Sequence, residues 1–175
     1  NYAEPGGATD PVVLAHGLLS DREMLSPQIA AAKDGNRFIT WDARCHGETE
    51  NTEDPFTYWD LADDLKGLLD HLGVERAVIG GMSQGGFVAL RFALRYPERV
   101  SALIPMGTQA GVEDAEKVAN YQVILDVWDS EGLNDQLANT FAPIVLGNDW
   151  LGSHDGNAEG TQKRQPTQHT ASPTV

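Results

Sequence analysis

The sequence carries a serine between paired glycines, directly after a short apolar run. Residues 80–86 read Gly-Gly-Met-Ser-Gln-Gly-Gly with Ser83 at the centre, and residues 76–79 before them read Arg-Ala-Val-Ile. A strand that ends in Gly-x-Ser-x-Gly and continues at once into a helix holds the serine on a sharp turn with its hydroxyl exposed. Gly81 and Gly85 are small because a side chain there would strike the neighbouring strand or helix. The pattern therefore predicts a nucleophilic serine, with an ordinary glycine turn as the alternative.

Attack by Ser83 on an acyl carbon would create an oxyanion, which needs hydrogen-bond donors where the charge forms. Backbone N–H groups that are fixed in place supply this stabilisation without reorganising. The N–H of Gln84, the residue after the nucleophile, lies at the start of the predicted helix, where the helix dipole favours negative charge. We therefore predict that Gln84 supplies one donor of an oxyanion hole.

Short apolar runs alternate with amphipathic segments between residues 12 and 106. Strands are predicted at residues 12–15, 37–41, 76–79 and 100–106, and helices after residues 20, 57 and 84. Ser20 with Glu23, and Thr57 with Asp60, have the spacing of a capping box that starts a helix. Strands that are apolar on both faces and separated by helices predict an α/β fold, in which a mostly parallel sheet carries helices on both faces.

The carboxyl ends of parallel strands joined by right-handed crossovers meet at one edge of the sheet, where ligands bind. The loop at residues 16–18 leaves the first strand, the turn that begins at Asp42 leaves the second, and Ser83 leaves the third. We expect these three segments, which are distant in sequence, to lie close together.

Composition excludes several classes of function. The chain has 175 residues, of which 41% are hydrophobic and 22% charged, which predicts a folded domain with a real core. Its formal net charge of −14 disfavours a nucleic-acid partner and an anionic membrane surface. Its single cysteine, Cys45, excludes an internal disulfide, and no apolar run approaches the roughly 20 residues of a membrane span. We expect a soluble protein, with the cytoplasm as the default location.

The alternation of strands and helices stops after residue 110. Amphipathic patterns near residues 121–128 and 133–141 predict two helices with no strand between them, and residues 152–175 are rich in Gly, Thr, Gln and Pro. The predicted organisation is a sheet core at residues 1–110, a partial helical cap at residues 111–151 and a polar tail at residues 152–175.

Four motifs, in this order, resemble the α/β-hydrolase superfamily. Residues 12–17, 41–47, 81–86 and 95–100 read VVLAHG, WDARCHG, GMSQGG and RYPERV. The likeness is greatest to the esterase, enol-lactonase and perhydrolase-like branch with a helical cap. It implies that the N–H of Leu18 is the second oxyanion donor and that His16 orders this loop instead of acting as a base. Cys45 and Thr49 stand where the family more often has glycine and serine, which we interpret as local packing changes.

We call the sharp turn that carries Ser83 the elbow. A serine at the elbow indicates acyl transfer, because members of this superfamily that attack alkyl carbons carry an aspartate there. The expected substrates are small carboxylic esters or lactones, with C–C cleavage of activated ketones and peracid formation as alternatives. No cofactor is expected, since the glycines do not fit a nucleotide-binding spacing. No histidine or cysteine spacing suits a metal.

The catalytic acid and base are not identified by the sequence. A nucleophilic serine needs a histidine base and an orienting acid, and the resemblance implies that both follow two strands beyond those found here. Only His154 and His169 follow Ser83, both in the polar tail. Asp149, after the apolar residues 142–146, is an alternative acid if those residues form a strand and not part of the cap, and His154 is an alternative base.

We interpret the chain as a family member truncated at both ends, with Tyr2 left from antiparallel strands that open the fold. Residues 100–104 would then form an apolar sheet edge that seeks a partner, so we expect a homo-oligomer, joined through this edge or the cap helices. Two functions fit the sequence: a serine hydrolase, or a binding protein of the same fold that lacks acid and base.

Overall fold

The computed structural model describes residues 2–3, 11–32, 34–132 and 134–146. The chain forms two compact units, of which the first contains the sheet with α1, α2 and α3, and the second contains α4 and α5. Each unit is described by itself. The division at residues 110 and 151 stays a prediction, and the tail lies outside the described residues.

The sheet of the first unit is mostly parallel, as the sequence predicts. Its strands are β1 (Tyr2–Ala3), β2 (Val12–Ala15), β3 (Phe38–Trp41), β4 (Ala77–Met82) and β5 (Val100–Met106), in the order β1-β3-β2-β4-β5. β2 pairs in parallel with β3 and with β4, and β4 pairs in parallel with β5. β1 pairs antiparallel with β3 and is the antiparallel strand expected at Tyr2.

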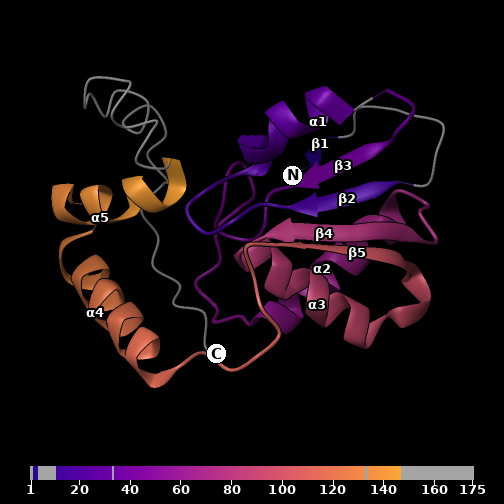
Figure 1. Cartoon of the computed structure of the whole chain (residues 1–175). Coiled ribbons are helices and arrows are strands. Elements are labelled where there is room, and N and C mark those ends of the chain that lie inside the picture. Colours follow the sequence, from indigo (N-terminus) through magenta and orange to yellow (C-terminus); the bar gives the residue numbers. More distant parts are fainter. Residues whose placement is uncertain (1, 4–10, 33, 133, 147–175) are drawn as a thin grey trace. The chain divides into compact units, whose positions relative to one another are not determined.

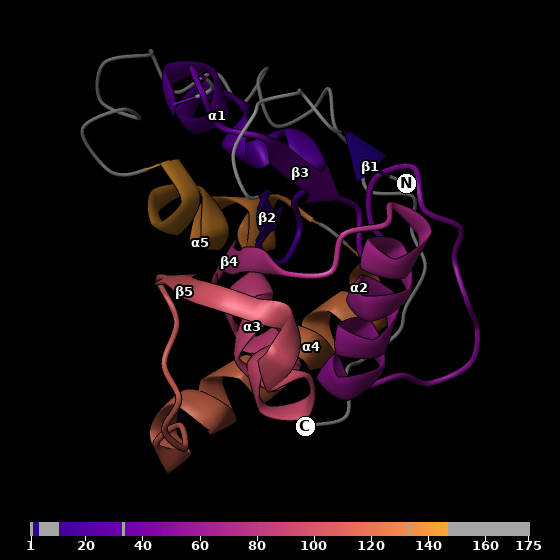
Figure 2. The same cartoon turned by 90° about the vertical axis from the view of Figure 1, so that its right-hand side faces the viewer.

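Helices cover both faces of this sheet (Figure 1). One face carries the 3-10 helix η1 (Arg22–Leu25) and α1 (Ser26–Ala32), and the other carries α2 (Tyr58–His71), α3 (Gln84–Arg95) and η2 (Pro97–Arg99). Figure 2 shows α2 and α3 side by side, in agreement with their packing contacts. The α/β fold predicted from the alternation of elements is therefore confirmed.

Local capping explains where two of these helices begin. The predicted capping box of α2 is present: the Thr57 N–H donates to Asp60 Oδ2 at 2.7 Å, and the Thr57 hydroxyl oxygen accepts from the N–H of Asp60. The predicted box of Ser20 with Glu23 is wrong. Asp21 caps η1 instead, accepting from the Glu23 N–H at 2.9 Å, because the chain first makes a 3-10 turn and only then an α-helix.

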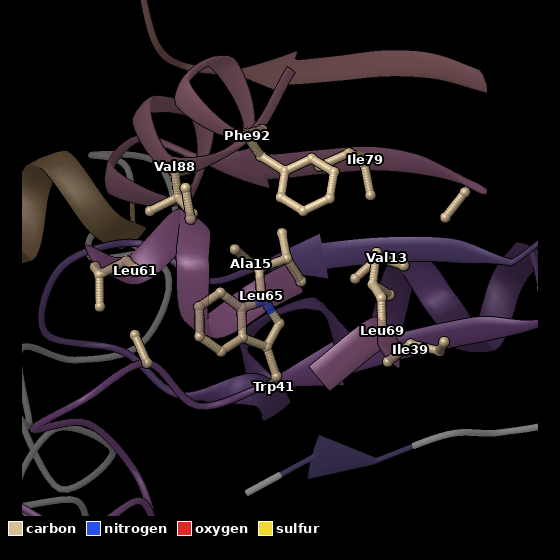
Figure 3. Close-up of a cluster of buried hydrophobic side chains, with 14 of the residues drawn as sticks. Val13, Ala15, Ile39, Trp41, Leu61, Leu65, Leu69, Ile79, Val88 and Phe92 are labelled. Carbon is tan, nitrogen blue, oxygen red and sulfur yellow. The ribbon is translucent and has the colours of Figure 1, made fainter. Parts of the chain in front are cut away.

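The core consists of two clusters, one on each face of the sheet. The larger one joins the sheet to α2 and α3 and includes Phe92, Ile39 and Ile79, which have no exposed surface (Figure 3). The smaller one joins Leu14 and Phe38 of the sheet to Leu25 and Ile29. Neighbouring residues of β2 contribute to opposite clusters, which is why this strand is apolar throughout. Burying such side chains contributes about 1.5–3 kcal/mol each.

β5 forms one edge of the described sheet and is the most exposed strand. Its side chains Leu103 and Ile104 are each 39% exposed. The carbonyl of Met106 accepts a hydrogen bond from the Ser83 N–H, so Met106 turns its main-chain groups towards β4. By strand alternation, the main-chain groups of Leu103 and Pro105 face the open edge, whereas a register shift at Ser101 interrupts the alternation. Pro105 has no N–H, so few donors remain there.

The second unit contains α4 (Ala115–Glu131) and α5 (Asp135–Leu146). Asp114 caps α4 by accepting from the Lys117 N–H at 2.9 Å, and Gly132, with φ 68°, ends it. Because α5 continues to Leu146, the strand alternative for residues 142–146 is wrong. No helix in the described part of the chain has the length and apolar character that crossing a bilayer requires.

Candidate active site

Three loops meet at the carboxyl edge of the sheet, where β2 lies between β3 and β4. The chain passes to one side of β2 to form β3 and to the other side to form β4, which makes the end of β2 a switch point. Each of the three loops contains one residue with a left-handed φ: Leu19 after β2 (61°), Cys45 after β3 (61°) and Ser83 after β4 (50°). They are the non-glycine residues of the described chain with this conformation. Such strain gathers at functional sites.

Ser83 occupies the junction between β4 and α3. Its N–H donates to the carbonyl of Met106 at 2.8 Å, and its own carbonyl accepts from the Gly86 N–H at 2.9 Å. Both main-chain groups are therefore fixed, one by β5 and one by the first turn of α3. The side chain makes no capping hydrogen bond, although Ser83 is in the N-cap position. Its hydroxyl is therefore not occupied by a capping hydrogen bond.

The close approach of α3 to the sheet leaves no space for side chains at the elbow. A Cβ on Gly81 would overlap main-chain atoms of Gly85, and a Cβ on Gly85 would overlap the carbonyl of Ala15 at the end of β2. This contact puts the first turn of α3 against the loop that follows β2. Gln84, the first residue of α3, is buried, and N–H groups in this position lack an acceptor within the helix.

The imidazole of His16 is fixed at both nitrogens. The Ala43 N–H donates to Nε2 at 3.1 Å, so Nε2 carries no proton. Nδ1 must then carry it, and Nδ1–H donates to the carbonyl of Gly17 at 2.8 Å. Burial lowers the pKa of His16 to about 4, so the ring is neutral near pH 7. With both nitrogens occupied, His16 orders the loop and has no free lone pair with which to act as a base.

A buried carboxylate joins this loop region to the turn after β3. The Asp42 side chain is fully buried and accepts from the main-chain N–H groups of Arg22 (2.7 Å) and Glu48 (3.1 Å). It also pairs with the Arg22 guanidinium, which reaches Glu48 Oε2 at 2.6 Å. Burial alone would raise the pKa of Asp42, but these donors outweigh burial and lower it. Gly47 makes room for this carboxylate, since a Cβ there would overlap it.

No base for Ser83 is found among the described residues. The ring of His46 lies beside that of His16, tilted by 45° with centroids 4.8 Å apart, and its Nδ1–H donates to the carbonyl of Arg44 at 2.8 Å. In the part of the chain that the structure describes, no side chain hydrogen-bonds the Ser83 hydroxyl. The alternative acid Asp149 and the histidines His154 and His169 lie outside the described residues.

Other features of the described residues do not suggest a cofactor. They contain no group of three or more His, Cys, Asp or Glu side chains placed to hold a metal. A cavity of about 450 Å³ lies beside Val74, before β4 and so at the opposite end of the strand from Ser83. The Arg99 guanidinium there is already bound by Asp70 and by two main-chain carbonyls.

The sequence did not indicate the residues that hold the first loop. Arg22 and Met24 follow the His-Gly turn by only a few positions, but neither belongs to a motif. Met24 Sδ accepts a hydrogen bond from the Gly17 N–H at 3.4 Å. An acidic residue predicted at the same edge of the sheet as Arg22 could have suggested an ion pair, whereas nothing in the sequence predicts a contact with a thioether. The sequence predicts a local packing change at Cys45, whereas the left-handed φ of this residue gives a backbone reason why glycine suits the position.

Comparisons with known proteins agree with this geometry. Residues 10–150 match the family model described as the alpha/beta hydrolase fold. The chain is 32% identical over 117 residues to 3-oxoadipate enol-lactonase 2 of Acinetobacter baylyi, which covers 66% of this chain and 44% of that protein.

Two solved structures are also similar. An esterase from Thermogutta terrifontis has 34% identity and a TM-score of 0.73 over 82% of this chain and 52% of its own. The enol-lactonase from Burkholderia xenovorans LB400 has 28% identity and a TM-score of 0.79 over 89% of this chain and 59% of its own. The chain spans about half the length of the curated relatives it matches, such as 44% and 47% of the two Acinetobacter lactonases.

Strain at Cys45 gives a first prediction. Cys45→Ala and Cys45→Gly both remove the thiol, but only glycine adopts a φ of 61° without steric cost. We expect the glycine variant to be more stable than the alanine variant by about 1 kcal/mol, since relief of strain exceeds the entropy cost of glycine. Urea unfolding of both variants measures this difference. If Cys45→Ala were as stable as Cys45→Gly or more stable, the inference of backbone strain at position 45 would be contradicted.

The buried histidine gives a second prediction. His16 has a pKa of about 4 in the folded protein and 6.5 as the unperturbed value, so the unfolded chain binds more protons between these values. Stability from the neutral ring is therefore complete above pH 6.5 and is lost as the pH falls towards 4. In His16→Gln this loss should be smaller by about 3 kcal/mol. Denaturant unfolding from pH 4 to 7 tests this, and parallel curves for the two proteins would refute it.

Proposed function

Because the chain belongs to the α/β-hydrolase fold family, we propose that it is a serine hydrolase that acts on small carboxylic esters or lactones through an acyl-enzyme on Ser83. The observation that carries the proposal is the conformation of Ser83, a non-glycine residue with φ 50° between a strand and a helix. Its hydroxyl is not used for capping. Relatives that are enol-lactonases and an esterase support the same class of substrate.

In the proposed reaction, Ser83 Oγ bonds to the carbonyl carbon of the substrate and its proton passes to a base. The carbonyl oxygen becomes an oxyanion that accepts hydrogen bonds from the N–H groups of Gln84 and Leu18. The C–O bond then breaks, the leaving alkoxide takes the proton from the base, and the acyl group stays on Ser83. Water repeats these steps to release the carboxylic acid. In a lactone the leaving oxygen remains attached to the acyl group.

The base and the acid stay unassigned in this proposal. Both nitrogens of His16 are bound to main-chain groups. The two histidines that follow Ser83 in the sequence, His154 and His169, lie outside the described residues. This favours one alternative, a protein of the same fold that binds acyl compounds without turning them over. Oxyanion donors and binding alone retain some catalysis when a triad member is missing, so slow acylation remains compatible with the first function.

Labelling by an organophosphonate separates these functions. We expect the probe to modify the protein on one serine and Ser83→Ala to abolish the label. Ser130→Ala, which removes an exposed serine of α4, should be labelled like the wild type. Mass spectrometry of the intact protein and its peptides measures the modification. A folded wild type that binds small acyl compounds but is never labelled would support the binding protein and contradict the hydrolase.

We also propose that the chain self-associates through the edge of β5. Leu103 and Ile104 present apolar surface there, and the strand carries no charged side chain that would discourage pairing. The main-chain N–H and carbonyl of Leu103 are the groups that a second strand could use, since Pro105 has no N–H. Pairing of two copies would bury this surface and satisfy these groups.

Sedimentation velocity tests the edge. We expect the wild type to form dimers as its concentration rises, and Leu103→Lys to shift the population to monomer because a charge would be buried. Leu94→Lys is the matched control, since Leu94 is 74% exposed and belongs to α3, not to β5. A wild type that stays monomeric at high concentration would disprove the proposal.

A further inference from the structure

Hydrogen bonds hold the peptide units on both sides of Gly17. A Cβ on Gly17 would meet no atom closer than 3.7 Å, so close packing does not explain the glycine at this position. The Gly17 N–H donates to Met24 Sδ at 3.4 Å, and its carbonyl accepts from His16 Nδ1 at 2.8 Å. Without these two bonds, glycine would rotate more freely than any other residue.

The bond at the Gly17 carbonyl determines the direction of the next N–H, and the bond at the Gly17 N–H holds the peptide unit before it. The carbonyl of Gly17 and the N–H of Leu18 belong to one planar trans peptide unit, so they point in opposite directions. Fixing the carbonyl therefore fixes the Leu18 N–H. The bond from the Gly17 N–H to Met24 holds the preceding peptide unit, so Gly17 is fixed on both sides. Leu18 itself is 49% exposed, so burial of its own side chain holds it less firmly than a core residue.

Met24 can act as a fixed acceptor because the residues around it are anchored. It lies in η1, between Arg22, whose N–H and guanidinium bind Asp42, and Leu25, which is buried in the smaller core cluster. Asp21 caps the same 3-10 turn. A methionine side chain is flexible, and its thioether is a weak acceptor. Anchoring on both sides compensates for that flexibility.

We propose that Met24 is a positioning residue whose sulfur, through the Gly17 N–H, orients the Leu18 N–H towards the oxyanion. The proposal rests on the function proposed above, in which Leu18 is an oxyanion donor. It assigns a role in the reaction to a side chain that is neither the proposed nucleophile nor a proposed oxyanion donor. It also makes η1 the element that connects the buried Asp42 to the oxyanion hole.

The test replaces the acceptor while the volume is retained. In Met24→Leu we expect kcat for a small ester to fall about 5- to 10-fold with KM within about twofold, because the donor acts on the oxyanion and hardly on the bound ester. The Gly17 amide should exchange with solvent about tenfold faster, as one hydrogen bond is lost. Met24→Gln offers a carbonyl acceptor and should restore both values to within about threefold of wild type.

The control is Ile29→Val, which removes one methylene group from the smaller core cluster, where it packs with Leu25 of η1, but leaves the loop contacts in place. We expect Ile29→Val to lose about as much stability as Met24→Leu, and to keep the wild-type kcat and the wild-type exchange rate of the Gly17 amide. NMR measures the exchange whether or not the chain hydrolyses the ester. If the wild type has no hydrolase activity but Gly17 exchange is faster in Met24→Leu, the proposed function is refuted, while the hydrogen bond between the Gly17 N–H and Met24 is supported. Unchanged Gly17 exchange would overturn the role of Met24, even if kcat fell.

Discussion

The site depends on how closely the main chains of β4, α3 and β2 approach one another. At Gly81 and Gly85 the main chains touch directly, and any Cβ would overlap a neighbouring main-chain atom. This contact places the first turn of α3 beside the end of β2. It therefore brings together Ser83, the buried Gln84 and the loop at residues 16–18. The strained φ of Ser83 follows from the same constraint, because the chain must turn sharply to enter the helix.

Polar contacts then hold the loops that the close approach brings together. Asp42 is buried with main-chain and guanidinium donors around it, which compensate its charge. His16 contacts the turn after β3 with one nitrogen and its own loop with the other. These groups connect the segments that follow β2 and β3, so the two loops form one ordered surface. Removing one partner would leave a buried polar group unsatisfied.

Some features were predictable because their cause is local. Glycine spacing around Ser83 and the capping box of Thr57 depend on residues a few positions apart, and both features are found at the predicted places. The start of η1 was not predictable in this way. Ser20 and Asp21 are both residue types that suit an N-cap, and the 3-10 turn decides between them. Cys45 shows a similar limit. Its sequence neighbours do not disclose a left-handed φ that the turn after β3 imposes.

The sequence alone determined the parallel sheet with helices on both faces, the serine at its elbow and the edge of the sheet where the loops converge. These follow from apolar periodicity and from glycines, whose effects act within a few residues. Only the tertiary structure decided which groups meet at that edge. The tautomer of His16, the partners of Asp42 and the thioether acceptor for Gly17 each join positions on different elements. Contacts of this kind depend on how helices and strands pack, which local patterns do not specify.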